Sequence, residues 1–440
     1  MLKPGVIPGE EPILRVGIVL PEDKQETITL VLSDIESTFL VINDEHKIPV
    51  FNHKIEVKLF ENTLTLKAYD YSGPIRNIKL IQDNENTSID AFPVIAGRGF
   101  HWAKHIHVNL PNTIEISIVN NVLMLVNELP LETYLACVAT SEMGAECPDS
   151  FIEAQTIVAR SWMLANVEQK HIKLGFDVCN DDCCQRYQGV NNLTETSKSG
   201  AMKTKGQVLM FDNTICDARY SKSCGGIMEK FENLWEDKPL PYMQNLSDSK
   251  YDFNVDLSIE QEMEKWVDSS PEAFCSPHFI PEDQLKKYLG NVDEEGHYFR
   301  WTVKTTQKEI VDNINNKLNL EAEKIISLKP LKRAGSGRML ELEINYRDKF
   351  GNLQAIVIYK DYEIRRVLHK MFLYSSAIVI NEVFSEDLDY PVEFIFKGAG
   401  WGHGAGLCQI GGLGMSLNGY KTKEILYHYY PGSTLEKIYH

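Results

Sequence analysis

The chain has 440 residues, of which 43% are hydrophobic and 24% are charged. This ordinary globular composition excludes collagen-like chains, coiled-coil rods and wholesale disorder, and the length suits two or three packed units of roughly 150 residues each. The formal net charge is −17. A field of that sign repels phosphate backbones and anionic membranes, so a general nucleic-acid-binding protein is excluded and an uncharged or locally matched ligand is expected.

The sequence shows neither a membrane span nor an export signal. No run approaches the roughly 18 apolar residues that a spanning helix needs. Residues 1–12 include a lysine but no apolar core, so we expect no signal peptide as written. The nine cysteines are odd in number and irregularly spaced, which favours a reducing compartment, although four bridges and one free thiol are the alternative.

The first part of the chain has the pattern of short strands. Apolar residues alternate at period two or form short blocks between turn-forming residues. The pair Asn120-Asn121 predicts a hairpin turn between the last two strands. The expected strands are 13–20, 28–32, 55–59, 64–68, 106–110, 114–119 and 122–126.

Helical patterns follow. One helix is expected over 131–142 and a second after Pro148, where Ser150-Phe-Ile-Glu153 has the form of a capping box. Gly175 begins a polar loop, and a hairpin is expected around Asp212-Asn213. Further along the chain we expect helices at 258–267, 306–318 and 423–430 and strands at 207–211, 215–220, 339–346 and 353–359.

Together these elements predict an α+β protein in which helices pack on mixed strands around a substrate groove. We expect an N-terminal β-rich domain at 1–100. The core is expected to be built from 101–247, with a helix and a cysteine loop, and from 300–440, with a glycine-rich segment. The acidic, partly helical residues 248–299 read as an insertion between the two parts of the core.

Glu142 is the most informative carboxylate. It falls on the apolar stripe of the helix 131–142, in register with Leu131, Leu135 and Val138. Removal from water penalises the charged form, so we expect its pKa to rise and the carboxyl to donate a proton near neutral pH. The alternative is that the helix frays at Gly144 and Glu142 reaches solvent; periodicity alone leaves both open.

Cys179, Cys183 and Cys184 place three thiols within six residues on the expected loop. Thiolates at this spacing can bind one zinc ion, which usually takes four nitrogen or sulfur ligands. The run itself holds no histidine, so the fourth ligand must come from elsewhere or be water. The alternatives are free thiols, or a bridge from Cys179 to Cys183 or Cys184.

The glycine-rich segment 398–406 does not have the spacing of a phosphate-binding loop, so no nucleotide or organic cofactor is expected. Its alternating glycines allow close backbone approach, either to a ligand, with Trp401 and His403 held up from the turn, or between strand and helix. The structural interpretation is favoured. A thiol nucleophile at Cys408 near His403 lacks an identifiable third group.

An ordered set of segments resembles the stage II sporulation protein D and amidase-enhancer family (SpoIID/LytB) of bacterial cell-wall proteins. The set runs from about residue 105 to the carboxyl end and is interrupted by the acidic insertion. Its members are 131–135, 141–143, 153–155, 159–161, 177–179, 184–187, 220–226, 234–235, 241–242, 336–338, 400–404, 409–411, 424–426 and 428–432.

The resemblance implies a lytic transglycosylase that cleaves peptidoglycan glycan strands, with Glu142 as the catalytic acid. Beside it, our own expectation is that Arg160, Tyr220, Ser223 and His403 lie around the sugar as hydrogen-bonding and orienting groups. Members of the sporulation branch carry zinc at the Asp-Val-Cys segment through cysteine and a neighbouring histidine. Here Cys183 stands where that histidine is expected, so Cys179, Cys183 and Cys184 form an altered site for a structural zinc.

Two other functions stay open at this stage. Amidase-enhancer members of the family act by stimulating a separate cell-wall amidase, and such a protein need not cleave glycan itself. A cytosolic protein on the same fold with a changed ligand is the third hypothesis, since wall chemistry requires export and the amino end shows no signal. The resemblance favours the cell envelope.

Overall fold

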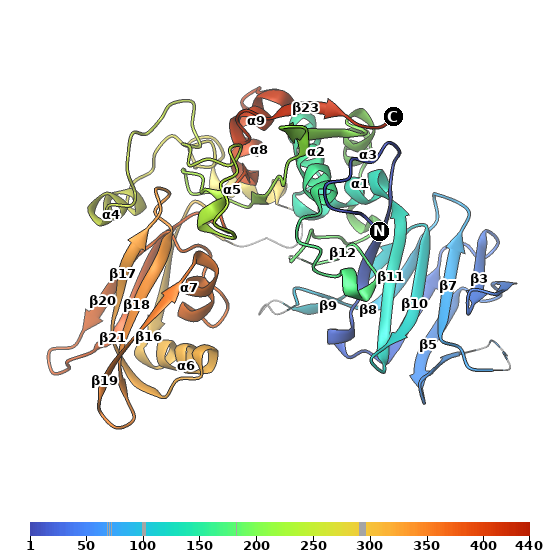
Figure 1. Cartoon of the computed structure of the whole chain (residues 1–440), viewed down its shortest axis with the longest axis horizontal. Helices are drawn as coiled ribbons and strands as arrows, with labels where there is room; N and C mark the ends of the chain where they lie inside the picture. Colours follow the sequence, from blue (N-terminus) through green and yellow to red (C-terminus); the bar gives the residue numbers. More distant parts are fainter. Residues whose placement is uncertain (68, 70, 72, 99–102, 182, 290–295) are drawn as a thin grey trace. The chain divides into compact units, whose positions relative to one another are not determined.

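The computed structural model describes residues 1–440 except 68, 70, 72, 99–102, 182 and 290–295. The chain forms two compact units, Met1–Asp217 with Leu435–His440, and Ala218–Thr434 (Figure 1). Both units mix helices and strands, so the predicted α+β class is confirmed. The predicted domain limits at 100, 247 and 299 stay a prediction.

Seven strands of the first unit form one sheet in the order β12-β1-β11-β10-β7-β3-β4. All neighbours are antiparallel except β1 and β12. The predicted turn at Asn120-Asn121 joins β10 to β11, and both asparagines adopt the positive φ that a tight hairpin requires. The strands are β1 (Ile13–Val19), β3 (Thr38–Ile42), β4 (His46–Pro49), β7 (Asn77–Gln82), β10 (Thr113–Val119), β11 (Val122–Pro130) and β12 (Val178–Cys179).

A second sheet of the first unit has the order β6-β5-β2-β8-β9. Burial alternates along its strands, and inward residues such as Leu30 and Val57 share one hydrophobic cluster with Leu40 and Leu80 of the seven-stranded sheet. The two sheets therefore share a core. The strands are β2 (Thr27–Leu32), β5 (Lys54–Phe60), β6 (Thr63–Leu66), β8 (Ile89–Ala96) and β9 (Lys104–Leu110); residue 68 of the predicted strand 64–68 lies outside the described residues.

Three helices of the first unit pack against one another: α1 (Leu131–Glu142), α2 (Asp149–Ala165) and α3 (Glu195–Lys203). A small sheet, β14-β13-β23, lies against α2; its strands are β13 (Gln207–Phe211), β14 (Thr214–Ile215) and β23 (Thr434–Lys437). The predicted capping box at Ser150 is wrong, because α2 begins one residue earlier, at Asp149. The predicted partner strand 215–220 is also wrong, since β14 ends at Ile215.

The second unit contains two three-stranded sheets, β16-β21-β20 and β17-β18-β19, and the parallel pair β15-β22. Their strands are β15 (Tyr220–Ser221), β16 (Arg300–Thr306), β17 (Ala322–Arg333), β18 (Met339–Asp348), β19 (Leu353–Tyr359), β20 (Ile378–Phe384), β21 (Pro391–Ala399) and β22 (Leu407–Cys408). Its helices are α4 (Glu260–Val267), α5 (Glu282–Leu285), α6 (Gln307–Leu318), α7 (Asp361–Leu368), α8 (Gln409–Leu417) and α9 (Thr422–Tyr429).

Residues 248–299, here called the acidic segment, belong to the second unit. Leu257, Met263 and Trp266 form a hydrophobic cluster with Val379 of β20 and Ala399 of β21. The segment is therefore held by its own buried side chains, and its residues 290–295 lie outside the described part. No helix among the described residues combines the length and apolar composition that crossing a membrane requires.

Candidate functional site

Glu142 is the last residue of α1. Ten residues of that helix are buried, but Glu142 itself is only half-buried, so the expected shielding from water is present in part. Its Oε1 accepts a hydrogen bond from the backbone N–H of Arg186 at 3.0 Å. The helix end thus presents a carboxylate that solvent can reach and that a backbone donor holds in place.

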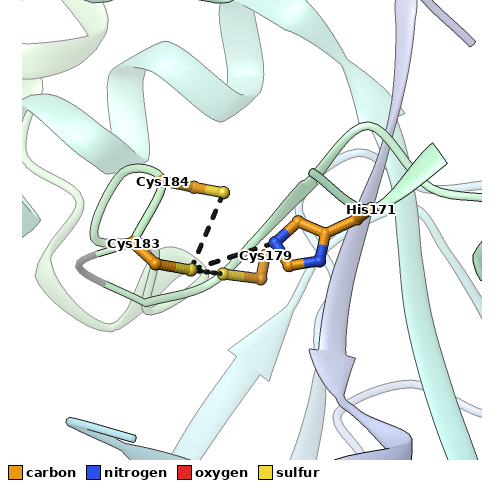
Figure 2. A group of neighbouring side chains, drawn as sticks. All are labelled: His171, Cys179, Cys183 and Cys184. Atoms are coloured by element: carbon orange, nitrogen blue, oxygen red, sulfur yellow. Dashed lines mark hydrogen bonds between the residues drawn. The ribbon is translucent and has the colours of Figure 1, made fainter. Parts of the chain in front are cut away.

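The three predicted cysteine ligands lie together, and the structure adds a fourth donor. Figure 2 shows the imidazole of His171 beside the sulfurs of Cys179, Cys183 and Cys184. Cys183 Sγ lies 3.0 Å from Cys179 Sγ, 4.0 Å from Cys184 Sγ and 3.9 Å from His171 Nε2. Sequence reasoning missed His171; the signal was a histidine eight residues before the first cysteine of the run.

This cluster has the chemistry of a zinc site. One nitrogen and three sulfur donors lie within 4.8 Å of one another, and zinc takes four such ligands in structural sites. All three cysteines are free, so the alternative of a bridge within the run is not formed. The hydrogen bonds among the three thiols lower the pKa of Cys183 and raise those of Cys179 and Cys184, so Cys183 is the thiolate of the cluster.

The loop that carries the cysteines also carries Arg186, and it is fixed on both sides of that residue. Gln185 Nε2 donates to the carbonyl of Ala159 on α2 at 3.2 Å. Tyr187 stacks on Tyr134 of α1 with ring centroids 5.1 Å apart, and its hydroxyl donates to Asn127 of β11 at 2.7 Å. The N–H that meets Glu142 is therefore positioned by contacts with α1, α2 and the sheet.

Arg160 lies inside the first unit. It is fully buried, and its Nε and Nη2 donate to both oxygens of Glu132 at 2.9 and 2.5 Å. Glu132 Oε1 also accepts from the hydroxyl of Tyr439 at 2.7 Å and from the N–H of Gly206 at 3.2 Å. These contacts give Arg160 a structural role; its predicted contact with the sugar stays a prediction.

Tyr220, Ser223 and His403 belong to the second unit, where the structure brings them together. His403 is hydrogen-bonded to the backbone of Tyr220, and Ser223 exchanges two backbone hydrogen bonds with Trp401, at 3.0 and 2.8 Å. Ser223 is fully buried, and its hydroxyl has no hydrogen-bond partner among the described residues. Glu142 and Arg160 lie in the first unit.

The glycine-rich segment makes the close backbone approach that its composition predicts. Gly400 has φ +77°, and a Cβ there would lie 2.8 Å from the backbone carbon of Cys224 and the carbonyl oxygen of Ser223. Only glycine suits both the left-handed conformation and the contact. The favoured structural interpretation of the segment is therefore supported at this position.

His403 carries no charge in the folded protein near neutral pH. Burial lowers its pKa to about 3, and the positive charges of Arg219, Arg338 and Arg365 act in the same direction. Its Nδ1 accepts the N–H of Ala405 at 3.1 Å. The imidazole is thus held neutral by its surroundings.

We expect this histidine to make the protein less stable in acid. In the unfolded chain this histidine takes up a proton below about pH 6.5, whereas in the folded chain it does so only near pH 3. Its contribution to the free energy of unfolding is therefore complete above about pH 6.5 and is lost as the pH falls from there toward about 3. His403→Gln should reduce the slope of the free energy of unfolding against pH in this interval, measured by urea titration. Identical slopes for the two proteins would contradict the prediction.

Comparisons with known proteins match both units in part. A family model described as "Stage II sporulation protein" matches residues 119–211, and a model described as "Domain of unknown function (DUF8618)" matches residues 229–406. The first match contains α1 with Glu142 and all four residues of the cluster in Figure 2.

Three curated relatives are similar over about two thirds of the chain. An uncharacterized protein of Brachyspira hyodysenteriae is 23% identical over 71% of this chain and 68% of its own length. The amidase enhancer of Bacillus subtilis is 24% identical over 68% of this chain but only 39% of its own length. The stage II sporulation protein D of Bacillus amyloliquefaciens is 24% identical over 70% of this chain and 74% of its own length.

The family model thus matches the segment that holds the half-buried glutamate and the cysteine loop, and two of the relatives carry names of the same kind. The resemblance seen in the sequence motifs is confirmed: residues 119–211 match the stage II sporulation protein model, and the chain is similar to a stage II sporulation protein D and to an amidase enhancer.

Proposed function

We propose that the protein is a lytic transglycosylase that cleaves the glycan strands of peptidoglycan with Glu142 as its single acid and base. The observation that supports this most is the carboxylate at the end of α1, reachable by solvent and held by the N–H of Arg186 at 3.0 Å. General acid catalysis needs a carboxyl that is both accessible and fixed in direction. A cell-envelope location follows from this substrate.

The reaction needs only one carboxyl group. Glu142 donates its proton to the glycosidic oxygen, the bond to the leaving sugar breaks, and an oxocarbenium-like centre develops. The C6 hydroxyl of the same sugar attacks that centre and gives a 1,6-anhydro end. Glu142, now a carboxylate, accepts the hydroxyl proton and returns to its starting state.

For Tyr220, Ser223 and His403 we propose hydrogen bonds to sugar. Tyr220 and His403 are partly exposed, and the neutral imidazole of His403 lies edge-on to the ring of Trp235 with centroids 4.9 Å apart. Aromatic rings beside neutral hydrogen-bonding groups suit an uncharged saccharide. The buried hydroxyl of Ser223 is the least accessible of the three.

A structural zinc ion suits the cluster of His171, Cys179, Cys183 and Cys184. When bound, it would hold the loop closed and would take no part in the chemistry. The loop's own residues do the work that matters for Glu142: Gln185 and Tyr187 anchor the backbone, and Arg186 supplies the N–H.

We expect Cys179→Ser with Cys184→Ser to lower the zinc content by about one ion per chain and the cleavage rate by roughly 10–100-fold, because the loop that orients Glu142 loosens. Metal analysis and a glycan-release assay measure the two effects. Cys216→Ser, at a buried cysteine of the same unit outside the cluster, is the matched control and should change neither. Equal zinc in the double variant and the control would contradict the assignment.

The function itself is tested by incubating the full chain with purified glycan strands stripped of their peptide stems and weighing the products. A transglycosylase releases fragments with 1,6-anhydro ends. Fragments with ordinary reducing ends would instead indicate a hydrolase that uses water.

A second candidate function rests on one relative. The amidase enhancer of Bacillus subtilis suggests that the chain stimulates a cell-wall amidase. In that case stem-stripped glycan stays intact, while adding the chain to a purified amidase speeds the release of peptide stems from whole peptidoglycan. Glu142→Gln should leave such stimulation unchanged.

A further inference from the structure

The second unit contains a cluster of four metal-binding side chains: Cys224, Asp248, Cys275 and Cys408. They come from separate stretches of the chain: the loop after β15, two positions of the acidic segment, and the residue that caps α8. Their donor atoms all lie within 4.8 Å of one another, and each residue is at most 3% exposed.

The spacing of the sulfurs suits a tetrahedral ion. Cys224 Sγ and Cys275 Sγ are 3.8 Å apart. Two sulfurs bound at about 2.3 Å to one zinc ion, at the tetrahedral angle, lie about 3.8 Å from each other, whereas a disulfide needs about 2.05 Å. All the cysteines of the cluster are free.

The sulfur atoms of the cluster accept hydrogen bonds from backbone N–H groups, as the ligand atoms of metal sites commonly do. Cys408 Sγ accepts the backbone N–H groups of Cys224 and Gly411, at 3.2 and 3.4 Å, and Cys224 Sγ accepts that of Gly226 at 3.4 Å. Such outer hydrogen bonds orient ligands and stabilise thiolate charge.

The carboxylate of Asp248 is oriented in the same way. The hydroxyl of Tyr429 donates to its Oδ1 at 2.6 Å, and the N–H of Cys275 donates to its Oδ2 at 3.0 Å. A Cβ on Gly411 of α8 would lie 2.7 Å from either oxygen, so the helix backbone closes directly over the carboxylate. The aspartate is therefore held in a fitted pocket rather than free to turn.

The charge of the Asp248 carboxylate is not balanced by a lysine or arginine among the described residues. Asp248 is fully buried, and His428 Nε2 lies 3.8 Å from its Oδ1. A buried carboxylate beside three thiols is costly unless a positive charge compensates it. Three sulfurs with one oxygen suit zinc rather than magnesium or calcium, which take oxygen ligands.

We propose that Cys224, Asp248, Cys275 and Cys408 bind one zinc ion in a closed structural site. With four protein ligands the ion has no open position, so it takes no part in glycan cleavage. The ion connects the acidic segment, through Asp248 and Cys275, with Cys224 and with Cys408, the residue before α8.

Metal counting on the purified full chain tests the site. We expect about two zinc ions per wild-type chain, because the cluster of Figure 2 holds the other. The triple variant Cys179→Ser, Cys183→Ser, Cys184→Ser should keep about one ion, and adding Asp248→Asn with Cys275→Ser should remove it. Adding Cys216→Ser to the triple variant instead is the control and should leave the ion in place.

Two further measurements on the triple variant test the same site. Cobalt substituted into the triple variant should give thiolate-to-cobalt charge-transfer absorption, and alkylation after unfolding should find every remaining cysteine free. A triple variant without metal overturns the proposal, as does a Cys224–Cys275 disulfide found by mass spectrometry. If the triple variant does not fold, Asp248→Asn with Cys275→Ser in the otherwise unchanged chain should contain about one ion fewer than the wild type, and an unchanged zinc content overturns the proposal. None of these readouts involves glycan, so they stand apart from the test of cleavage.

Discussion

Replacing Glu142 with glutamine should lower the release of anhydro-sugar products by roughly 100–10,000-fold and leave the fold intact. The amide cannot donate a proton to the glycosidic oxygen, and general acid–base catalysis contributes about that factor. The amide oxygen can still accept the N–H of Arg186, so the contact that orders the loop is kept. Mass analysis of products from stem-stripped glycan measures the loss.

Glu146→Gln is the matched control, since it makes the same chemical change at an exposed glutamate four residues further along the chain. It should retain wild-type activity. Circular dichroism and thermal unfolding should be the same for both variants and the wild type. Undiminished anhydro products from Glu142→Gln would remove this residue from the mechanism.

Arg160→Met should destabilise the first unit by about 3–5 kcal/mol, because it leaves the carboxylate of Glu132 buried without its positive partner. Tyr439 and Gly206 would still donate hydrogen bonds to that carboxylate but would supply no charge. The free energy of unfolding in urea measures the effect.

Lys203→Met in the same unit is the control, because Lys203 and Asp149, the nearer of its two acidic partners, are both more than half exposed. Its loss should cost about 1 kcal/mol or less. Adding Glu132→Gln to Arg160→Met should recover part of the lost stability, since the unpaired charge is then removed. A cost for Arg160→Met as small as that of the control would contradict a structural role for the pair.

Features that depend on neighbouring residues were predictable from the sequence. The strands β1, β2, β5 and β10 follow apolar alternation, and α1 and α6 follow helical periodicity. The N-terminus of α6 also depends on nearby residues, since Thr306 and Glu309 exchange capping hydrogen bonds. The cysteine run indicated a metal site because its thiols are close in sequence.

Features that depend on residues far apart in the sequence could not be predicted. The edge strand β12 has only two residues and is defined by its parallel pairing with β1. The ion pair of Arg160 could not be predicted either, because a charged side chain within a helix gives no sign of its buried partner Glu132. His171 lies outside the cysteine run and joins it only through the path of the loop.

The second cluster shows the same limit more clearly. Cys224, Asp248, Cys275 and Cys408 are spread over most of the second unit and follow no short motif. The segment containing two of them was read as an insertion without chemistry. Only tertiary packing brings the four side chains together.

The last residues of the chain return to the first unit, where β23 joins β13 and the hydroxyl of Tyr439 reaches Glu132. During translation, the ribosome therefore releases the whole of Ala218–Thr434 before this final strand becomes available. Until then the nascent first unit has an open sheet edge and a buried ion pair that lacks one of its donors. The first unit therefore completes this sheet only after the second unit has been synthesised, and its unpaired strand edge is open to non-native pairing in that interval.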